Sequence, residues 1–489
     1  MPGLTRKRFT RRTSGMMLAG AAAAVLAACG EPTVRVVGSP EEARGPAGPA
    51  GATGAVGAPG ASGAAGAQGA MGRTTQVVQY WSNLSASHPE SIARAANFKE
   101  FNDTVGQDLG ILVDLSNAAG GMGGNAQGGS NKEKVKTLVA GGTPPDMYYT
   151  GYTDVSEYFV AGMTIDLDTE LKAEKGWAEQ RADIFPAMLV SSMWAGKLVG
   201  MPGYTNNIAM IYNKGLLEQA NVPFPQQGWT WDDLKESAIK FVREGMIPYS
   251  LRWHYVFWTT YLGTTGSLPL NQDTWKMQVD TSESLEVTEF WLDLLKNKII
   301  LVNEEGTTGL GETYRQAKND TVFEIQGPYR IPTLRKNNAP DFGVIHNPVH
   351  PVAKQVFANN GGHNMIVFKD AKPENRRAAA LVAKWMNAPK AQTQMVIRAT
   401  SIPVSKATMQ STELNDYLKT DPHLKGWVDV APFGYRWPSL PSLSKITGPV
   451  HRILPEIMLQ KIGPKSGLEQ AQREAQVALD EDVALMQSS

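Results

Sequence analysis

The chain has 489 residues, and its 47 lysine and arginine residues equal its 47 aspartate and glutamate residues, so its formal net charge is zero. This balance argues against the strongly basic surface with which proteins bind nucleic acids or anionic membranes, and we expect no nucleic-acid partner. The length exceeds the size at which a single hydrophobic core stops growing, so we expect two domains in the globular part.

Residues 1–28 have the layout of an export signal, with a basic start and an apolar run that ends in small residues. The run, residues 16–28, is shorter than the about 20 residues that a membrane-spanning helix needs. The sequence LAAC at residues 26–29 is similar to the lipobox of bacterial lipoproteins, which implies that Cys29 is acylated and anchors the protein to the extracytoplasmic face of the cell membrane. The alternative is an ordinary signal that leaves a free thiol on a secreted protein.

Two export routes remain open. The sequence TRKRFT at residues 5–10 resembles a twin-arginine signal with lysine in the second arginine position, and the alternative is a general secretory signal with many positive charges. Cys29 is the only cysteine of the chain, so its acylation would leave no thiol for a disulfide. The core alone would then hold the fold together.

Residues 45–72 carry a glycine at every third position, ten in all, which is the spacing of the collagen triple helix. A single chain of this composition cannot bury a core, so we expect residues 29–74 to form a solvated stalk between the lipidated Cys29 and the globular part. The alternative is a homotrimer held by a triple helix, which would be marginal because the tract is short and contains only three prolines.

The globular part is expected to begin near Thr75 with alternating strands and helices, a pattern that predicts an α/β domain with a mostly parallel sheet. The glycine-rich segment 118–130 has the spacing of neither common phosphate-binding motif, so we expect a surface loop there. The first predicted elements are a strand at Val77–Trp81, a helix at Ile92–Phe101, a strand from Ile111, a helix with Val135, Leu138 and Val139 on its apolar face, and a strand from Asp146 to Tyr149.

The rest of the chain continues with both kinds of element. Residues 196–213 predict two short strands with a break at Pro202-Gly203, and Thr230 is suited to cap a helix that begins at Trp231. Two later helices are predicted to present apolar faces to the core, one with Leu381, Val382, Trp385 and Met386, the other with Leu468, Ala471, Ala475, Leu479 and Val483.

Five further segments follow one another along the chain: AGGTPPDMYYT at 140–150, the stretch from GKLVG to WTWDDL at 196–234, FEIQGPYR at 323–330, NNGGHN to KWMN at 359–387, and TSIPVSKAT at 400–408. Together, in this order, they resemble the sugar-binding family of extracellular solute-binding proteins, the substrate receptors of ABC importers. The resemblance implies a two-lobed fold similar to periplasmic binding proteins, with a hinge and an interlobe cleft.

The resemblance implies that residues 75–207 and 356–402 form one lobe and residues 208–355 and 403–489 the other. It further implies a receptor without cofactor or enzymatic activity, which captures a mono- or oligosaccharide and delivers it to the permease of an ABC importer. One alternative is a receptor for glycerol phosphate or a glycerophosphodiester. Another is a surface adhesin or scaffold in which the collagen-like tract is the functional part.

Aromatic rings can stack on the C–H faces of a sugar, and polar side chains and glycine backbone groups can hydrogen-bond to its hydroxyl groups. By resemblance, Trp253 and Tyr329 face the cleft from the second lobe and Trp81 and Tyr152 from the first. The phosphate alternative needs a cation, for which Arg436 and His254 are candidates. The candidate ligand-binding residues are Trp81, Ser82, Tyr149, Tyr152, Asn206, Asn207, Trp253, His254, Gln326, Tyr329, Gly361, Gly362, His363, Tyr435, Arg436 and Trp437.

The sequence contains few signals of catalytic activity. The chain has neither G-x-S-x-G nor H-E-x-x-H. His346 and His350 are four residues apart, but Pro348 between them argues against a helix that would bring both to one metal, so we expect loop histidines and no metal site. A pair of carboxylates suited to glycoside hydrolysis stays open, because its members would be distant in the chain.

Overall fold

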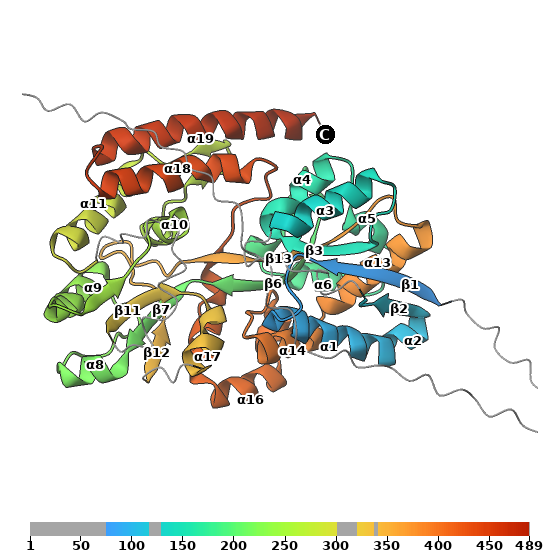
Figure 1. Ribbon diagram of the computed structural model, residues 1–489, viewed down its shortest axis with the longest axis horizontal. Coiled ribbons are helices and arrows are strands. Elements are labelled where there is room, and N and C mark those ends of the chain that lie inside the picture. Colours follow the sequence, from blue (N-terminus) through green and yellow to red (C-terminus); the bar gives the residue numbers. More distant parts are fainter. Residues whose placement is uncertain (1–74, 117–128, 301–319, 337–340, 489) are drawn as a thin grey trace, which may run out of the picture. The chain divides into compact units, whose positions relative to one another are not determined.

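We analyse a computed structural model, in which residues 75–116, 129–300, 320–336 and 341–488 are described (Figure 1). The expected export signal, Cys29, the collagen-like tract and most of segment 118–130 lie outside these ranges and stay predictions. Within the described ranges, no helix is both long enough and apolar enough to cross a membrane.

A six-stranded sheet is built from segments that lie far apart in the sequence (Figure 1). Its strands follow the order β14-β13-β3-β1-β2, and β6 also pairs with β13. β1 is parallel to β2 and β3, whereas β13 is antiparallel to β3 and β6. The strands are β1 (Gln76–Ser82), β2 (Ile111–Asp114), β3 (Met147–Gly151), β6 (Met201–Asn207), β13 (Ala358–Val367) and β14 (Gly434–Tyr435).

A four-stranded sheet has the order β12-β7-β11-β8. β11 is parallel to β8 and antiparallel to β7, and β7 is also antiparallel to β12. Its strands are β7 (Ala209–Asn213), β8 (Ile247–Ser250), β11 (Thr321–Gln326) and β12 (Phe342–Ile345). Two short pairs lie outside both sheets, β4 (Met193–Trp194) with β5 (Lys197–Leu198) and β9 (Leu270–Asn271) with β10 (Lys276–Met277).

Both larger sheets are mixed, and in the six-stranded sheet three of the five pairings between described strands are parallel. The predicted alternation does produce parallel pairing where helices connect β1, β2 and β3. The chain then passes through the four-stranded sheet and enters the six-stranded sheet again along β13, where it runs in the opposite direction to β3. Whether β13 runs parallel or antiparallel to β3 depends on the path of the chain between them, which local sequence periodicity does not determine.

The chain passes from one sheet to the other at Ile208, between β6 and β7. We expected a break at Pro202-Gly203, and this was wrong, because both residues lie inside β6. The register of β6 with β13 shifts between His363 and Asn364, so Gly203 is an extra residue in the pairing. Such a bulge accommodates a glycine within a strand.

Helices flank the strands, and the predicted helix signals are confirmed. The Thr230 side chain accepts a hydrogen bond from the Asp233 backbone, and Asp233 returns one, so this capping box begins α9. The helices are α1 (Pro89–Asp103), α2 (Val105–Leu109), α3 (Gly129–Ala140), α4 (Val155–Val160), α5 (Leu167–Leu171), α6 (Trp177–Asp183), α7 (Pro186–Val190), α8 (Lys214–Gln219), α9 (Trp231–Ala238), α10 (Tyr255–Thr264), α11 (Ser282–Lys296), α12 (Ile331–Lys336), α13 (Pro373–Met386), α14 (Pro389–Ala399), α15 (Lys406–Gln410), α16 (Thr412–Thr420), α17 (Pro422–Val428), α18 (Leu443–Met458) and α19 (Pro464–Gln487).

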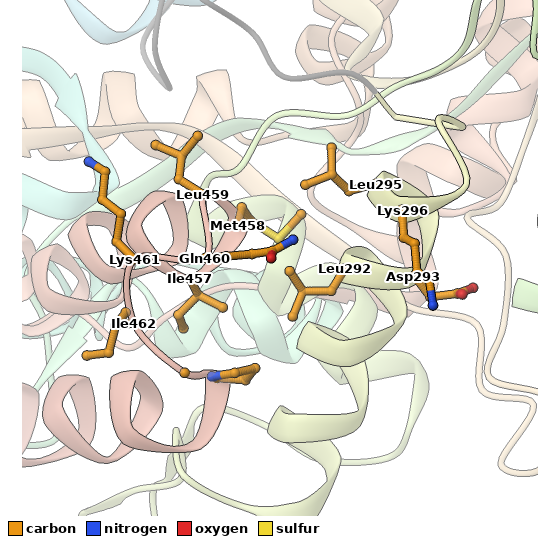
Figure 2. Close-up of a pocket in the computed structure, with 12 residues that line it drawn as sticks. Leu292, Asp293, Leu295, Lys296, Ile457, Met458, Leu459, Gln460, Lys461 and Ile462 are labelled. Atoms are coloured by element: carbon orange, nitrogen blue, oxygen red, sulfur yellow. The ribbon is translucent and has the colours of Figure 1, made fainter.

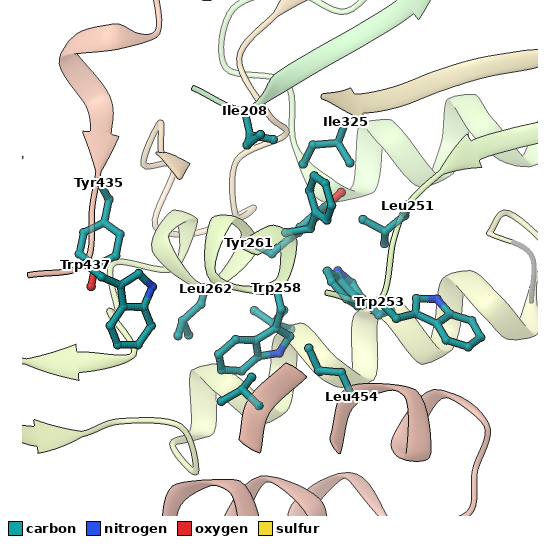
Figure 3. Close-up of a cluster of buried hydrophobic side chains, with 14 of the residues drawn as sticks. Ile208, Leu251, Trp253, Trp258, Tyr261, Leu262, Ile325, Tyr435, Trp437 and Leu454 are labelled. Atoms are coloured by element: carbon teal, nitrogen blue, oxygen red, sulfur yellow. The ribbon is translucent and has the colours of Figure 1, made fainter. Parts of the chain in front are cut away.

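The largest hydrophobic cluster is rich in aromatic side chains (Figure 3). Trp258 and Tyr261 of α10 pack in it with Leu454 of α18, and Tyr435 of β14 joins them. Tyr148 of β3 belongs to the same cluster, which therefore contains elements of both larger sheets. Burial of each large apolar side chain contributes about 1.5–3 kcal/mol, so the C-terminal segment and helices help to hold the two sheets together.

Candidate functional site

The candidate residues lie in strands or in the segments that follow them, in two groups. The parallel strands β8 and β11 end at a common edge, and ligands bind beyond such carboxyl ends in many open α/β sheets. The group on the six-stranded sheet comprises Trp81, Ser82, Tyr149, Tyr152, Asn206, Asn207, Gly361, Gly362, His363, Tyr435, Arg436 and Trp437, and the group that ends or follows β8 and β11 comprises Trp253, His254, Gln326 and Tyr329.

Three rings lie nearly parallel to one another in the first group. The ring centres of Tyr149 and His363 are 5.0 Å apart at an interplanar angle of 16°, and those of Tyr204 and His363 are 5.7 Å apart at 14°. The hydroxyl oxygen of Tyr204 lies 3.0 Å from Nδ1 of His363. Burial and, to a smaller extent, the nearby Arg94 lower the pKa of His363 to about 3. The imidazole is therefore neutral at neutral pH.

A buried ion pair from α1 contacts these rings. Glu90 and Arg94 are 6% and 2% exposed, and Oε2 of Glu90 lies 3.7 Å from Nη2 of Arg94. The hydroxyl of Tyr149 donates to Oε2 of Glu90 over 3.5 Å. Burial raises the pKa of Glu90 to about 7, although Arg94 opposes this. The site thus contains a carboxyl group that titrates near neutral pH.

Arg436 connects the strands of the first group and is 1% exposed. Its Nη2 donates to the backbone oxygens of Tyr204 on β6 over 2.9 Å and of Gly361 on β13 over 2.5 Å, and its Nη1 donates to Oγ of Ser191 over 3.3 Å. Gly362 has a φ of 137°, and a Cβ there would overlap the guanidinium group. Burial lowers the pKa of Arg436 to about 10, so it stays cationic at neutral pH.

Several buried polar atoms near the end of β6, the start of β13 and β14 have no hydrogen-bond partner among the described residues. Asn360 is in register with Asn207, and Asn359 with Tyr435, so these side chains stand on neighbouring strands. Buried polar groups are seldom left without a partner in native proteins, so this set points to a polar ligand or bound water. The atoms are Asn207 Oδ1, Asn359 Nδ2, Asn360 Oδ1 and Nδ2, Tyr435 Oη, Arg436 Nε and Trp437 Nε1.

The second group presents one exposed ring and one buried ring. Tyr329 is 49% exposed, and its hydroxyl donates to Oε1 of Gln326 over 2.8 Å. Trp253 is 5% exposed and belongs to the largest hydrophobic cluster (Figure 3). Its Nε1 has no hydrogen-bond partner in the described part of the chain. Tyr329 is therefore accessible to a solute, whereas most of the Trp253 ring is part of the core.

His254 begins α10, where its Nδ1 accepts a hydrogen bond from the Val256 backbone over 3.2 Å. Its ring lies 4.2 Å from the ring of His451 on α18. Burial lowers the pKa of His254 to about 3, with smaller contributions from His451 and Arg252. At neutral pH His254 is uncharged and offers no cation to a phosphate group.

Other candidates of the first group make local contacts. The Lys134 ammonium lies 4.9 Å from the Trp81 ring centre. Buried Ser82 accepts a hydrogen bond from the Leu84 backbone over 3.1 Å. Oδ1 of Asn206 accepts from the Gly361 backbone over 3.1 Å, and Nδ2 of Asn207 donates to the Trp427 backbone oxygen over 2.8 Å. Tyr152 packs against the guanidinium of Arg436, with 5.0 Å to the ring centre. Ligand contact by these residues stays a prediction.

Sequence reasoning missed Glu90, Arg94 and Tyr204. Opposite charges four residues apart on a helix usually form an ion pair on its solvated face, so the spacing of Glu90 and Arg94 does not indicate a buried site. Phe98 and Phe101 offered the signal that could have found them. Counting back from these two apolar residues in steps of three or four reaches positions 94 and 90, on the face of α1 that the structure buries.

Two pockets lie away from the candidate residues. The one in Figure 2 has a volume of about 920 Å³ and lies between α11 and the turn from α18 to α19, and another of about 460 Å³ lies beside α9. Nε2 of His346 accepts a hydrogen bond from the Gly228 backbone, and Nε2 of His350 contacts the carboxylate of Glu286. The described ranges hold no group of three or more His, Cys, Asp or Glu residues that could bind a metal ion.

Sequence comparison finds two kinds of match. The family model described as bacterial extracellular solute-binding protein matches residues 125–426, which is more than half of the chain. A binding protein from Brucella abortus strain 2308 is 22% identical over 369 residues, which cover 71% of this chain and 82% of that protein.

Solved structures share the fold at low sequence identity. The cyclic α-maltosyl-1,6-maltose binding protein from Arthrobacter globiformis matches with a TM-score of 0.71 and 18% identity, over 83% of this chain and 99% of that one. UgpB from Mycobacterium tuberculosis, in complex with glycerophosphocholine, matches with a TM-score of 0.66 and 16% identity, over 83% and 99%. The mixed α/β fold is thus that of the two-lobed periplasmic binding proteins, as expected.

Proposed function

Because the chain belongs to the family of bacterial extracellular solute-binding proteins, we propose that it captures a mono- or oligosaccharide and delivers it to the permease of an ABC importer. Such a receptor acts by binding and release, so it needs no catalytic group and no cofactor. Structures with the same fold include a cyclic α-maltosyl-1,6-maltose binding protein and a maltose-bound protein from T. maritima, which supports a carbohydrate as the solute.

The set of buried, unpartnered polar atoms on β6, β13 and β14 is the observation that carries this proposal. It offers amide donors and acceptors on Asn360, a hydroxyl on Tyr435 and an indole N–H on Trp437. A sugar carries many hydroxyl groups that both donate and accept, so it can satisfy a mixed set of this kind. The exposed ring of Tyr329 supplies a face on which a sugar ring can stack.

The proposed hinge uses the crossings between the two sheets. We assign residues 75–207 with 356–402 to one lobe and residues 208–355 with 403–489 to the other. β14 lies in the last of these ranges and yet pairs with β13 of the six-stranded sheet, so the chain makes a further crossing there. Rotation about a few crossing segments would open and close the solute site.

A glycerophosphodiester is the second candidate solute, and the buried cation Arg436 favours it. Its Nε has no hydrogen-bond partner among the residues described, and a phosphate group could accept from it. However, both terminal nitrogens of Arg436 already donate to Tyr204, Gly361 and Ser191. The guanidinium is thus largely committed to the protein, which favours a neutral carbohydrate.

The proposal extends to how the receptor is held at the cell. Acylation of Cys29 would tether it to the extracytoplasmic face of the membrane, after export by the twin-arginine or the general secretory route. Residues 30–74 would separate the anchor from the receptor as a stalk. If the collagen-like tract instead forms a trimer, the protein would present three receptors together or act as an adhesin.

A thermal-shift screen of the mature chain tests the solute class. The panel contains mono- and oligosaccharides, glycerol phosphate and glycerophosphocholine. A solute that binds only the folded state raises the unfolding temperature in proportion to the logarithm of its concentration at saturation. A saturable rise with a sugar supports the carbohydrate receptor, a rise with phosphorylated compounds alone selects the second candidate, and no rise at all favours the adhesin.

A further inference from the structure

We propose that Asn347 is the clamp of the interlobe hinge, a positioning residue whose side-chain amide holds two segments that cross between the lobes at one separation. The inference rests on the proposed function and deepens it, because a receptor that opens and closes on a solute needs a hinge with a preferred position. Removal of the amide should therefore change the separation of the lobes even when no solute is present.

Two crossing segments meet beside Asn347. Ile208 stands between β6 and β7, where the chain leaves the six-stranded sheet, and Phe357 stands directly before β13, where the chain returns to it. The backbone N–H of Ile208 donates to the backbone oxygen of Asn359 over 3.1 Å, so the two segments lie side by side. Rotation of one lobe against the other has to bend these segments, because they are covalent links between the residue ranges that we assign to the lobes.

The amide of Asn347 bonds to both segments. Its Nδ2 donates to the backbone oxygen of Ile208 over 2.7 Å and to that of Phe357 over 3.3 Å. Both partners are carbonyl oxygens, which only accept, so the nitrogen of the amide and not its oxygen must face them. Asn347 is 1% exposed, and its Oδ1 has no hydrogen-bond partner among the described residues. The side chain is thus held through its two donor bonds.

The backbone next to Asn347 is fixed to the loop that precedes α9. The backbone N–H of Gly228 donates to Nε2 of His346 over 2.9 Å, and Nε1 of Trp229 donates to the backbone oxygen of His346 over 2.9 Å. These residues all belong to the range that we assign to the second lobe, so Asn347 moves with that lobe. The bond from Asn347 to Phe357 therefore joins a fixed part of the second lobe to the segment that returns to the first.

Phe357 is also positioned from the side of α10. A Cβ at Gly263, within α10, would lie 2.3 Å from the Phe357 ring, so the ring rests directly on the helix backbone. Glycine is unfavourable in the interior of a helix, and this close approach is a physical reason for it here. The ring centre of Tyr435 lies 5.6 Å from that of Phe357. The position of Phe357 thus depends on α10 as well as on Asn347.

The clamp acts on the hinge because its two bonds respond differently to rotation of the lobes. The bond to Ile208 stays within the range of the second lobe, whereas the bond to Phe357 crosses to the first and changes length when the lobes rotate. A group shifts an equilibrium between two conformations only through interactions that differ between them. Loss of the neutral hydrogen bonds of Asn347 should change the ratio of two lobe positions by about tenfold.

Distances between two spin labels in the solute-free mature chain test this inference directly. Ala96→Cys on α1 and Glu289→Cys on α11 provide exposed labelling sites in the two lobes, and Cys29→Ser removes the natural thiol. In Asn347→Ala we expect a second label distance to grow by about tenfold relative to the distance that the unchanged protein favours. A distance distribution that is the same with and without Asn347→Ala would overturn the inference.

Asn387→Ala is the matched control. Nδ2 of Asn387 donates to the backbone oxygen of Pro202 over 2.6 Å, and its Oδ1 also lacks a partner in the described part of the chain. Asn387 is equally buried, but both it and Pro202 belong to the first lobe. This variant should lower the stability as Asn347→Ala does and leave the label distances unchanged. An equal change of the distances in both variants would reveal general loosening and would overturn the inference.

Gly263→Ala provides the test if Asn347→Ala does not fold. Alanine suits the interior of a helix, and its methyl group would displace the Phe357 ring, so the label distances should again change. Unchanged distances in Gly263→Ala would contradict the role of Phe357 in setting the lobe position. The distances are measured without solute, so they are independent of the thermal-shift screen. A change of the distances together with no binding of any sugar would support the clamp and contradict the proposed function.

Discussion

The guanidinium carbon of Arg94 lies 3.3 Å from the centre of the Tyr149 ring, and the two terminal nitrogens make no hydrogen bond within the described part of the chain. Its charge is balanced by Glu90, at 3.7 Å. A buried charge is costly unless it is paired, so each member of this pair makes the burial of the other tolerable. The pair therefore links the first turns of α1 to β3, where the candidate site begins.

Arg94→Met should destabilise the protein more at about pH 8 than at about pH 5. At the higher pH it leaves Glu90 as an unpaired buried carboxylate, with a loss on the order of 3 kcal/mol. At the lower pH Glu90 is protonated, because burial has already raised its pKa to about 7 and loss of Arg94 would raise it further. Urea unfolding at both pH values measures the two losses. Equal losses would contradict this account, and Arg94→Met combined with Glu90→Gln is the control without a titrating carboxyl.

His254→Asn should become progressively more stable than the unchanged protein as the pH falls below about 6.5. The folded-state pKa of His254 is lowered to about 3 from 6.5, so the unfolded chain binds a proton that the folded chain does not, and stability is lost as the pH falls. Asparagine also caps helices, so the start of α10 should be preserved. The expected gain near pH 5 is on the order of 1–2 kcal/mol. A difference in unfolding free energy that is constant with pH would show that His254 titrates normally in the folded protein.

Trp253→Ala and Tyr329→Ala should have opposite consequences. Trp253 is 5% exposed in the core, so its truncation should lower the unfolding free energy by about 3–5 kcal/mol. Tyr329 is 49% exposed, so its truncation should leave stability nearly unchanged and weaken sugar binding by roughly 1–3 kcal/mol. Chemical unfolding and calorimetric titration with the sugar found in the screen give the two quantities. Unchanged affinity in Tyr329→Ala would remove this ring from the site.

Arg436→Ala should destabilise the protein strongly whether or not a solute is present. It would leave the backbone oxygens of Tyr204 and Gly361 and the hydroxyl of Ser191 without this donor, with an expected loss of about 2–4 kcal/mol. Arg181→Ala is the matched control, because the partly exposed pair of Arg181 with Asp168 should contribute less than about 1 kcal/mol. If Arg436→Ala costs no more than Arg181→Ala in urea unfolding, the role of Arg436 in joining the strands is wrong.

Cys29→Ser should release the protein from the membrane fraction. The LAAC sequence and the short apolar run motivate this expectation. Fractionation of cells that carry either form, followed by immunoblotting, measures the distribution. Retention of Cys29→Ser in the membrane fraction, at the level of the unchanged protein, would show that some other part of the protein anchors it.

The local elements could be predicted from the sequence because their signals are short-range. The largely apolar run of β1, the glycine end of α3 and the capping box at Thr230 each depend on residues within a few positions of one another. The direction of β13 and the position of Gly203 inside β6 could not, because both depend on pairing between segments that lie more than 150 residues apart.

The candidate site was predictable only in part for a similar reason. Trp253 and Tyr329 are both aromatic residues, and only the fold shows that the Trp253 ring is buried and the Tyr329 ring exposed. The unpartnered atoms of Asn359 and Asn360 become visible only when β13, β6 and β14 are placed side by side. The burial of a side chain and its hydrogen-bond partners depend on the folded structure, so the spacing of residues in the sequence does not predict them.

Calorimetric titration of the mature chain and of Asn360→Ala, with the sugar that gives the largest thermal shift, tests the central claim most directly. Asn360 carries a buried amide of which neither polar atom has a partner among the described residues. We predict saturable binding of one sugar per chain. The affinity should be lower by about tenfold or more in Asn360→Ala, because one or two hydrogen bonds between neutral groups of Asn360 and the solute are lost. Equal affinities of the two proteins, or no saturable binding of any sugar to the unchanged chain, would contradict the assignment of this site as a carbohydrate receptor.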